Sequence, residues 1–375
     1  MSATRSEPIA ERVTRVADAA AAAGVDALLV SAPVNVRYVT GFTGSSRLAL
    51  ISARPDDGAS TAGHRFITDF RYATQASQEV AEAFDREVVA DKPLDAVAAC
   101  LGSAGGRLGF EEASLTVGAH RRLGERLPDA WRLVACEGIV EGLRAVKDAG
   151  ELERIRAAAA LADEALSSLL GEGIVGRSER DVASELELRM SKLGAEGASF
   201  ESIVAAGPHG ALPHATPRDQ LIGGDVLVTV DWGAKLEGYC SDCTRTFATG
   251  AEISRRAREV YELVREAQAL ALQDVRAGKT GREVDAVARA VIEQAGHGEH
   301  FGHGLGHGVG LDVHEAPRLS RTAGEVPLQS GNVVTIEPGV YLPGELGVRI
   351  EDLVIVTENG GETVTSIPKE LTVIG

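Results

Sequence analysis

Hydrophobic residues recur at helical spacing in some stretches of the chain and at strand spacing in others. Near the N-terminus, the apolar positions of residues 9–23 share one helical face, and Gly24 ends the pattern. Short strands are predicted at 25–30, 37–39, 48–51, 65–68 and 107–110. Because these strands alternate with helical stretches, we expect a small α/β domain that ends near residue 140.

A long helix is predicted to open the second half of the chain. Asp148 stands three residues before Glu151, the spacing of a capping box, and apolar residues then follow at helical spacing until Gly171. Further helices are predicted at about 178–193, 254–275 and 281–295. Hairpin-like strand pairs lie between them, so we expect an α/β (α+β) protein of two domains, residues 1–140 and 141–375.

The first of these hairpins places two carboxylates near each other. Residues 226–232 alternate as a strand does, 235–238 read as a turn, and 239–247 return. With a turn centred between residues 236 and 237, Asp231 faces Asp242 directly, at a Cβ separation of about 4.5–5.5 Å. A bulge at the turn would shift this register by one residue. Two like charges that close repel, which predicts a positive group between them.

The same pattern recurs in a later hairpin. Residues 333–341 and 347–356 flank a loop centred on Gly344, and counting outward from it brings Glu337 opposite Glu351. Two hairpins that each present a carboxylate pair can supply four oxygen ligands to one cleft.

A glycine-rich segment with three histidines lies between the hairpins. It reads GHGLGHGVGLDVHE and contains His303, His307 and His314. Each glycine costs about 1 kcal/mol relative to alanine inside a helix, so an extended or looped segment is expected. One imidazole with four carboxylates suits a pair of divalent ions such as Mn²⁺, Co²⁺ or Zn²⁺, and such pairs activate water and polarise carbonyls.

Composition and charge narrow the classes of partner. Hydrophobic residues make up 44% and charged residues 25% of the 375, as in a soluble globular protein. The formal net charge of -17 disfavours nucleic acid and anionic membrane surfaces as partners. No apolar run is long enough for a membrane span.

The N-terminus and the cysteines indicate a compartment. Residues 1–24 carry several charges and lack the apolar stretch of a signal peptide, so we expect a cytoplasmic protein with reduced thiols. Cys240 and Cys243 form a lone CxxC without two further ligands nearby. That pattern favours neither a structural zinc site nor a redox centre.

With these motifs the chain resembles metallopeptidase family M24, which has the pita-bread fold, and specifically its Xaa-Pro peptidase branch. The matching stretches are LPHATP (212–217), VDWGA (230–234), GYCSDCTRTF (238–247), GHGLGHGVGLDVHE (302–315), TIEPGVY (335–341) and VRIED (348–352). Residues 35–46 are similar to a creatinase-like N-terminal domain. The resemblance implies such a domain at 1–140 and a pita-bread catalytic domain at 141–375.

The resemblance also implies a role for each matching residue. Five would bind two divalent metal ions, with Mn²⁺ favoured: Asp231, Asp242, His307, Glu337 and Glu351. Glu337 would also act in acid–base catalysis, together with His303 and His314 as catalytic residues. The substrate would be bound by His214, His303, His314, Arg318 and Arg349, with Arg349 also orienting a metal ligand and Arg318 binding the product-side carboxylate.

The activity that the resemblance implies is hydrolysis of the Xaa-Pro bond at the N-terminus of short peptides, as an Xaa-Pro aminopeptidase. The alternative within the family is an Xaa-Pro dipeptidase (prolidase). A non-catalytic pita-bread binding protein is a further alternative, against which the intact set of ligand types argues. The family implies a homodimer or a tetramer.

Overall fold

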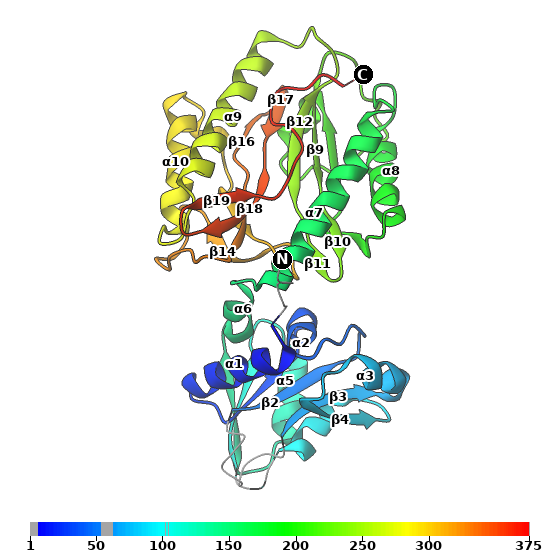
Figure 1. The fold of residues 1–375 in the computed structure, drawn as a ribbon, viewed down its shortest axis with the longest axis vertical. Helices are drawn as coiled ribbons and strands as arrows, with labels where there is room; N and C mark the ends of the chain where they lie inside the picture. The colour runs from blue at the N-terminus through cyan, green and yellow to red at the C-terminus, as the bar shows by residue number, and fades with distance from the viewer. Residues whose placement is uncertain (1–6, 54–62, 102, 104, 375) are drawn as a thin grey trace, which may run out of the picture. The chain divides into compact units, whose positions relative to one another are not determined.

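The computed structural model describes residues 7–53, 63–101, 103 and 105–374 (Figure 1). The chain divides into two compact units, one ending at Arg144 and the other beginning at Ala145.

The N-terminal unit is built on a six-stranded mixed sheet with the order β4-β3-β2-β1-β5-β6. The strands are β1 (Ala27–Val30), β2 (Leu48–Ser52), β3 (His64–Asp69), β4 (Phe84–Val89), β5 (Gly106–Glu111) and β6 (Trp131–Cys136). All four residues of β1 are buried, since both faces of the central strands are covered. The short strands predicted at 25–30, 48–51, 65–68 and 107–110 are therefore confirmed, whereas β4 and β6 were not predicted.

Six α-helices accompany this sheet in the described chain. They are α1 (Ile9–Ala22), α2 (Pro33–Thr40), α3 (Ala73–Glu79), α4 (Pro93–Ala96), α5 (Val117–Arg126) and α6 (Ile139–Arg144). The strand predicted at 37–39 is wrong, because these residues belong to α2. Pro33 occupies the first turn of α2, Val36 and Val39 are buried three residues apart, and Gly41 ends the helix with a φ of 81°.

The described part of the C-terminal unit contains four long helices, all at predicted positions. They are α7 (Ala149–Leu170), α8 (Glu179–Lys192), α9 (Arg255–Asp274) and α10 (Gly281–Gln294). The predicted capping box of Asp148 and Glu151 is present, and Ser178, Ser254 and Thr280 accept hydrogen bonds at the other three N-termini.

Two pairs of helices, α7 with α8 and α9 with α10, lie on opposite sides of the strands of this unit (Figure 1). The core beneath α7 and α8 includes residues of the sheet β12-β9-β8, and the core beneath α9 and α10 includes residues of the sheet β14-β13-β15-β18-β19. The strands are β7 (Gly197–Ala198), β8 (Ile203–Ala206), β9 (Leu227–Trp232), β10 (Ala234–Leu236), β11 (Tyr239–Cys240), β12 (Cys243–Ala248), β13 (Gly306–Gly308), β14 (Glu315–Leu319), β15 (Val333–Ile336), β16 (Gly339–Leu342), β17 (Leu346–Arg349), β18 (Asp352–Thr357) and β19 (Gly360–Thr363).

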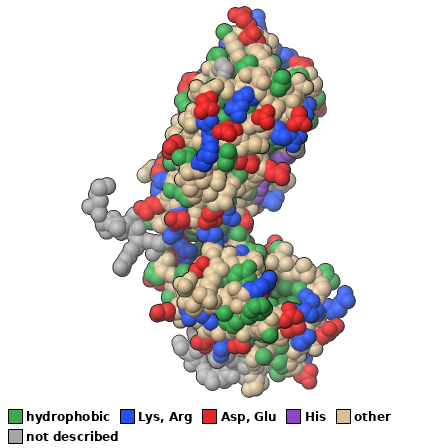
Figure 2. All heavy atoms as spheres, turned by 90° about the vertical axis from the view of Figure 1, so that its right-hand side faces the viewer, with side chains coloured by type: hydrophobic (Ala, Val, Ile, Leu, Met, Phe, Trp, Pro, Cys, Tyr) green, Lys and Arg blue, Asp and Glu red, His purple; other side chains and the backbone are tan. Residues whose placement is uncertain are grey.

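The surface of the C-terminal unit mixes charges of both signs. Figure 2 shows acidic and basic side chains interspersed over the visible face rather than gathered by sign. The described helices include none that is both long and apolar enough to cross a membrane.

Candidate metal centre

The first hairpin holds Asp231 and Asp242 on one side of the ladder, but not opposite each other. Asp231 pairs with Thr244, two residues beyond the partner that we predicted. Leu236 pairs with Tyr239, so the turn consists of Glu237 and Gly238. Both turn residues have a positive φ, of 48° and 85°, as a two-residue hairpin turn requires. The turn therefore lies one residue later than predicted, and the two aspartates are diagonal neighbours.

The second hairpin has the predicted register. Ile336 pairs with Asp352 and Gly339 with Arg349, so Glu337 and Glu351 stand opposite each other at the break between the two ladders. At this break their backbone N–H groups donate to two other segments of the chain. The N–H of Glu337 donates to the carbonyl of Leu305, and the N–H of Glu351 donates to the carbonyl of Thr244. The break thus joins the hairpin to the histidine segment and to the first hairpin.

As its glycines predict, the histidine segment is irregular except for the short strand β13 and its last residue, Glu315, which begins β14. Gly306 permits close contact, because a Cβ there would overlap the carbonyl oxygen of Thr335. Nδ1 of His307 lies 3.1 Å from the carbonyl oxygen of Gly308 and must donate to it, which leaves Nε2 as an acceptor. That Nε2 lies 3.3 Å from Oε1 of Glu337 and 3.6 Å from Oδ2 of Asp242.

These segments converge on a compact set of donor atoms. One ligand atom from each of Asp242, His307 and Glu351 lies within 4.8 Å of the other two. Glu337 adjoins this triad through His307. Asp231 lies outside it, yet its charge acts on Asp242 and on both glutamates. The structure therefore places all five predicted metal ligands in one region.

The carboxylates are buried together and repel one another. Burial and then repulsion from Glu351, Asp231 and Glu337 raise the pKa of the Asp242 carboxyl well above its usual range. Burial and then repulsion from Glu337 and Asp231 raise the pKa of Glu351 in the same way. Oδ1 of Asp231 is buried and accepts no hydrogen bond from the described chain. These crowded carboxylate oxygens, one of them without a hydrogen bond, lie beside an imidazole nitrogen that serves as an acceptor, and such a set of donor atoms fits divalent cations.

Arg349 lies in the middle of a hydrogen-bond network beside these ligands. Its guanidinium donates to Oδ2 of Asp231 (2.6 Å), to Oγ1 of Thr244 (2.9 Å) and to the hydroxyl of Tyr341 (3.0 Å). Tyr341 was not predicted to belong to the site. Nε2 of His303 lies 3.0 Å from its hydroxyl, and Nδ1 of His303 is 2.7 Å from the carbonyl oxygen of Gly304. Both ring nitrogens of His303 are therefore engaged within the protein.

Two threonines that the sequence analysis missed orient the glutamates. Thr244 donates to Oε2 of Glu351 over 2.6 Å, and Thr335 donates to Oε1 of Glu337 over 3.0 Å. Thr335 stands two residues before Glu337, and Thr244 two residues after Asp242. A period of two places side chains on the same face of a strand, and this signal identifies both threonines.

Three of the predicted substrate-binding residues, His214, His314 and Arg318, are exposed, whereas Arg349 is buried. The ring of His314 lies with its centroid 4.2 Å from that of His307, and burial followed by the charge of His307 lowers the pKa of His314. Arg318 is exposed on β14 and also acts electrostatically on both of these histidines. His214 is exposed in the connection between β8 and β9, and its charge acts on His303 and His314.

The CxxC thiols do not join the donor set. Cys240 and Cys243 are buried free cysteines, and Sγ of Cys243 lies 3.3 Å from the carbonyl oxygen of Glu351. Burial raises the pKa of Cys240 to about 11 and that of Cys243 well above its usual range. Both are thus held as unreactive thiols.

Comparison with known proteins gives the family. Residues 12–146 match the Creatinase/Prolidase N-terminal domain, and residues 153–358 match metallopeptidase family M24. An uncharacterized peptidase of Bacillus subtilis is 44% identical over 94% of this chain and 96% of its own length.

Two solved structures are similar along almost the whole chain. A structure titled Xaa-Pro dipeptidase from Bacillus anthracis has a TM-score of 0.91 at 40% identity and covers 98% of this chain and 100% of its own. A structure titled X-Pro aminopeptidase from Thermotoga maritima has a TM-score of 0.83 at 36% identity, with 94% and 98% covered. The chain therefore belongs to metallopeptidase family M24, with a creatinase-type N-terminal domain before a pita-bread domain, and is a hydrolase.

Proposed function

We propose that this chain is an Xaa-Pro dipeptidase whose site holds two divalent metal ions. The observation that carries the proposal is the group of three buried carboxylates, the half-buried Glu337 and one imidazole, in which Oδ1 of Asp231 lacks a partner within the described chain. The proposed ligands are Asp231, Asp242, His307, Glu337 and Glu351. When bound, such a pair of ions activates water and polarises the scissile carbonyl.

The residues of the chain divide the remaining work. Glu337 takes a proton from the attacking water and passes it to the leaving proline nitrogen, a general acid–base role. The hydrogen bond from Thr335 holds this carboxyl in one orientation. His314 lies beside His307 and steadies the carbonyl oxygen as charge develops on it.

We assign His303 no part in proton transfer. Since Gly304 and Tyr341 occupy both of its ring nitrogens, His303 offers only its ring to a substrate. A ring wall suits the apolar pyrrolidine of proline. His214 completes the substrate site from the loop between β8 and β9.

The dipeptidase alternative is better supported than the aminopeptidase that the sequence analysis favoured. The similar structure titled dipeptidase matches with higher identity and a higher TM-score than the one titled aminopeptidase. Arg318 adds a physical reason, because its cation lies exposed near His307 and His314. In an Xaa-Pro dipeptide the proline carries the C-terminal carboxylate, which a guanidinium binds well. In a longer peptide the same position is a neutral amide.

A paired assay tests this proposal. The protein is stripped with a chelator, and Mn²⁺, Co²⁺ or Zn²⁺ is returned before release of the first residue is measured from Xaa-Pro and from Xaa-Pro-Yaa. We expect metal-restored cleavage of the dipeptide and much weaker cleavage of the tripeptide. Equal or faster cleavage of the tripeptide would return the assignment to an aminopeptidase. Cleavage of neither peptide with any of these ions would support the non-catalytic alternative.

A further inference from the structure

A buried carboxylate outside the donor set fastens the segment that carries His214. Glu179 is the first residue of α8, and its side chain is fully buried. Oε1 accepts from the backbone N–H of Ala206 over 2.9 Å, and Oε2 accepts from the backbone N–H of Arg218 over 3.1 Å. Ala206 ends β8 and Arg218 lies twelve residues later, so one carboxylate holds both ends of residues 206–218.

Side chains of the same segment strengthen this attachment. Nδ1 of His209 lies 2.8 Å from Oε2 of Glu179, and Nε of Arg218 lies 3.3 Å from it. Burial works to raise the pKa of Glu179, but the hydrogen bonds from Ala206 and Arg218 outweigh it, and the pKa lies below its usual value. An apolar side chain in its place would leave the N–H groups of Ala206 and Arg218 without this acceptor.

Between its fastened ends, the segment meets the metal centre. Nη1 of Arg349 donates to the carbonyl oxygen of Pro213 over 3.1 Å, and the same guanidinium binds Asp231. The segment also lies directly on β17, because a Cβ at Gly347 would overlap the carbonyl oxygen of Gly210. His214 follows Pro213, so the position of its ring depends on how the segment is held.

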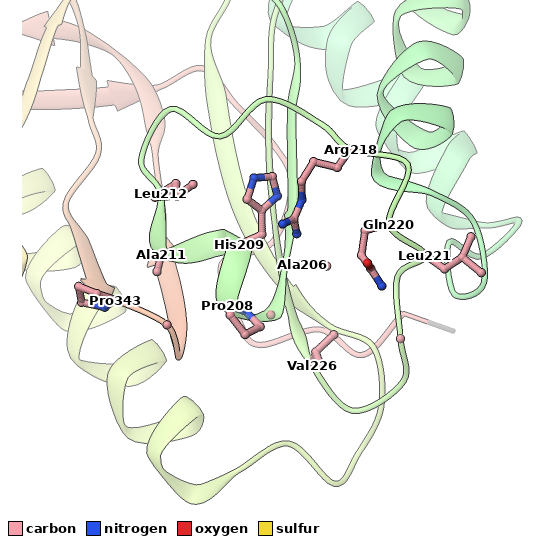
Figure 3. Close-up of a pocket in the computed structure, with 13 residues that line it drawn as sticks. Ala206, Pro208, His209, Ala211, Leu212, Arg218, Gln220, Leu221, Val226 and Pro343 are labelled. Carbon is pink, nitrogen blue, oxygen red and sulfur yellow. The ribbon is translucent and has the colours of Figure 1, made fainter.

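Part of the segment faces an open cavity rather than packed side chains. This cavity has a volume of about 620 Å³, and its lining includes Ala206, His209, Leu212, Arg218, Val226 and Pro343 (Figure 3). Side chains do not fill this space. The bonds to Glu179 therefore carry much of the constraint on this side.

We propose that Glu179 is a positioning residue for the reaction, which holds His214 near the other histidines of the site by fixing both ends of residues 206–218. This inference rests on the proposed function. Glu179 itself does not touch the substrate, so it acts on the rate by placing the segment and chiefly His214. Displacing a substrate-contacting group by about 1 Å can cost up to 100-fold in rate.

A double-mutant cycle separates this role from a general structural one. In Glu179→Gln one carboxylate oxygen becomes an NH₂, which can no longer accept from a backbone N–H. We expect kcat/KM for an Xaa-Pro dipeptide to fall roughly 10- to 100-fold in the native background. In the His214→Ala background the same substitution should change kcat/KM less than about twofold, since additivity fails for residues that act through one another. Bound metal, measured by elemental analysis, should be unchanged.

Asp219→Asn is the matched control. Asp219 adjoins the segment, its side chain is 84% exposed, and it pairs with Arg180 rather than with the segment. This control variant should leave kcat/KM and metal content as they are.

An equal loss for Glu179→Gln in both backgrounds, or no loss in either, overturns the proposal. If Glu179→Gln does not fold, Arg218→Gln removes the half-exposed guanidinium from Glu179 and should lower kcat/KM about threefold, again only with His214 present.

Amide hydrogen exchange keeps the inference separate from the assignment of activity. Peptides covering 207–218 should exchange faster in Glu179→Gln than in Asp219→Asn and in the native protein. If the native protein cleaves no Xaa-Pro dipeptide, the proposed function fails while this measurement still decides what Glu179 does. Unchanged exchange in Glu179→Gln overturns the positioning role whatever the activity.

Discussion

Nη2 of Arg349 donates a hydrogen bond to Oδ2 of Asp231 over 2.6 Å, and both side chains are buried. The other oxygen of Asp231 accepts no hydrogen bond from the described residues. The arginine therefore fixes the carboxylate in an orientation that leaves one oxygen free beside the other acidic side chains. This is the arrangement expected of a metal ligand that a neighbouring donor orients.

Arg349→Lys should retain the positive charge and lose the hydrogen-bond geometry of the planar guanidinium. A lysine ammonium cannot reach Asp231, Thr244, Tyr341 and the carbonyl of Pro213 at once, as the planar guanidinium does. We expect kcat/KM for Xaa-Pro to fall about 10- to 100-fold, with metal content less affected than activity. Steady-state kinetics and elemental analysis of the same preparation check this. Native activity in the lysine variant would show that charge alone is sufficient.

Asp242→Asn should weaken metal binding and remove the stabilisation that metal provides. A ligand that binds only the folded state raises the free energy of unfolding by RT ln(1 + [L]/Kd), about 2.7 kcal/mol at 100 times Kd. Mn²⁺ should therefore raise the melting temperature of the stripped native protein and raise that of the variant much less. Glu259→Gln serves as the control, since Glu259 forms a surface pair with Arg255. An equal shift in Asp242→Asn would remove Asp242 from the ligand set.

The two hairpins show which features of the site a sequence can predict. The later hairpin pairs as counted, because its loop is symmetric about Gly344 and the two ladders keep one register across the break at Glu337. The predicted register of the earlier hairpin was wrong because Glu237 adopts a positive φ, which nothing in its residue type indicates. A one-residue shift of the turn moved the partner of Asp231 by two positions.

Other contacts depend on tertiary neighbours that periodicity does not report. Tyr341 belongs to the site because its hydroxyl meets His303, which is distant in sequence, and Arg349 on the partner strand of its own hairpin. Glu179 looks like an ordinary first-turn helix residue until the backbone of Ala206 and Arg218 is placed around it. Residues 37–39 read as a strand because Tyr38 and Val39 are residue types that favour strands, whereas both are buried on a face of α2, which packs against α1 and β2.

Gly306→Ala should destabilise the protein where Gly302→Ala does not. A Cβ at Gly306 would overlap the carbonyl oxygen of Thr335, whereas a Cβ at Gly302 meets nothing within 4 Å. Overpacking of this kind costs about 1–3 kcal/mol, and the shift would also move His307. Chemical denaturation of both variants measures the difference, and metal titration detects the displaced ligand. Equal stability of the two variants would show that the strand moves aside without cost.

His64 should make the protein less stable as the pH falls. Its Nδ1 accepts a hydrogen bond from the N–H of Ser52, and burial lowers the pKa of the imidazole below its ordinary value of about 6.5. The unfolded chain therefore binds this proton at a higher pH than the folded chain does, so stability is lost from the unfolded pKa downward to the lowered folded pKa. His64→Asn retains an acceptor for Ser52 and removes the titration. Between pH 7.5 and 5.5 the native protein should lose more of its free energy of unfolding than this variant, whereas parallel losses would show that His64 does not contribute to the acid sensitivity.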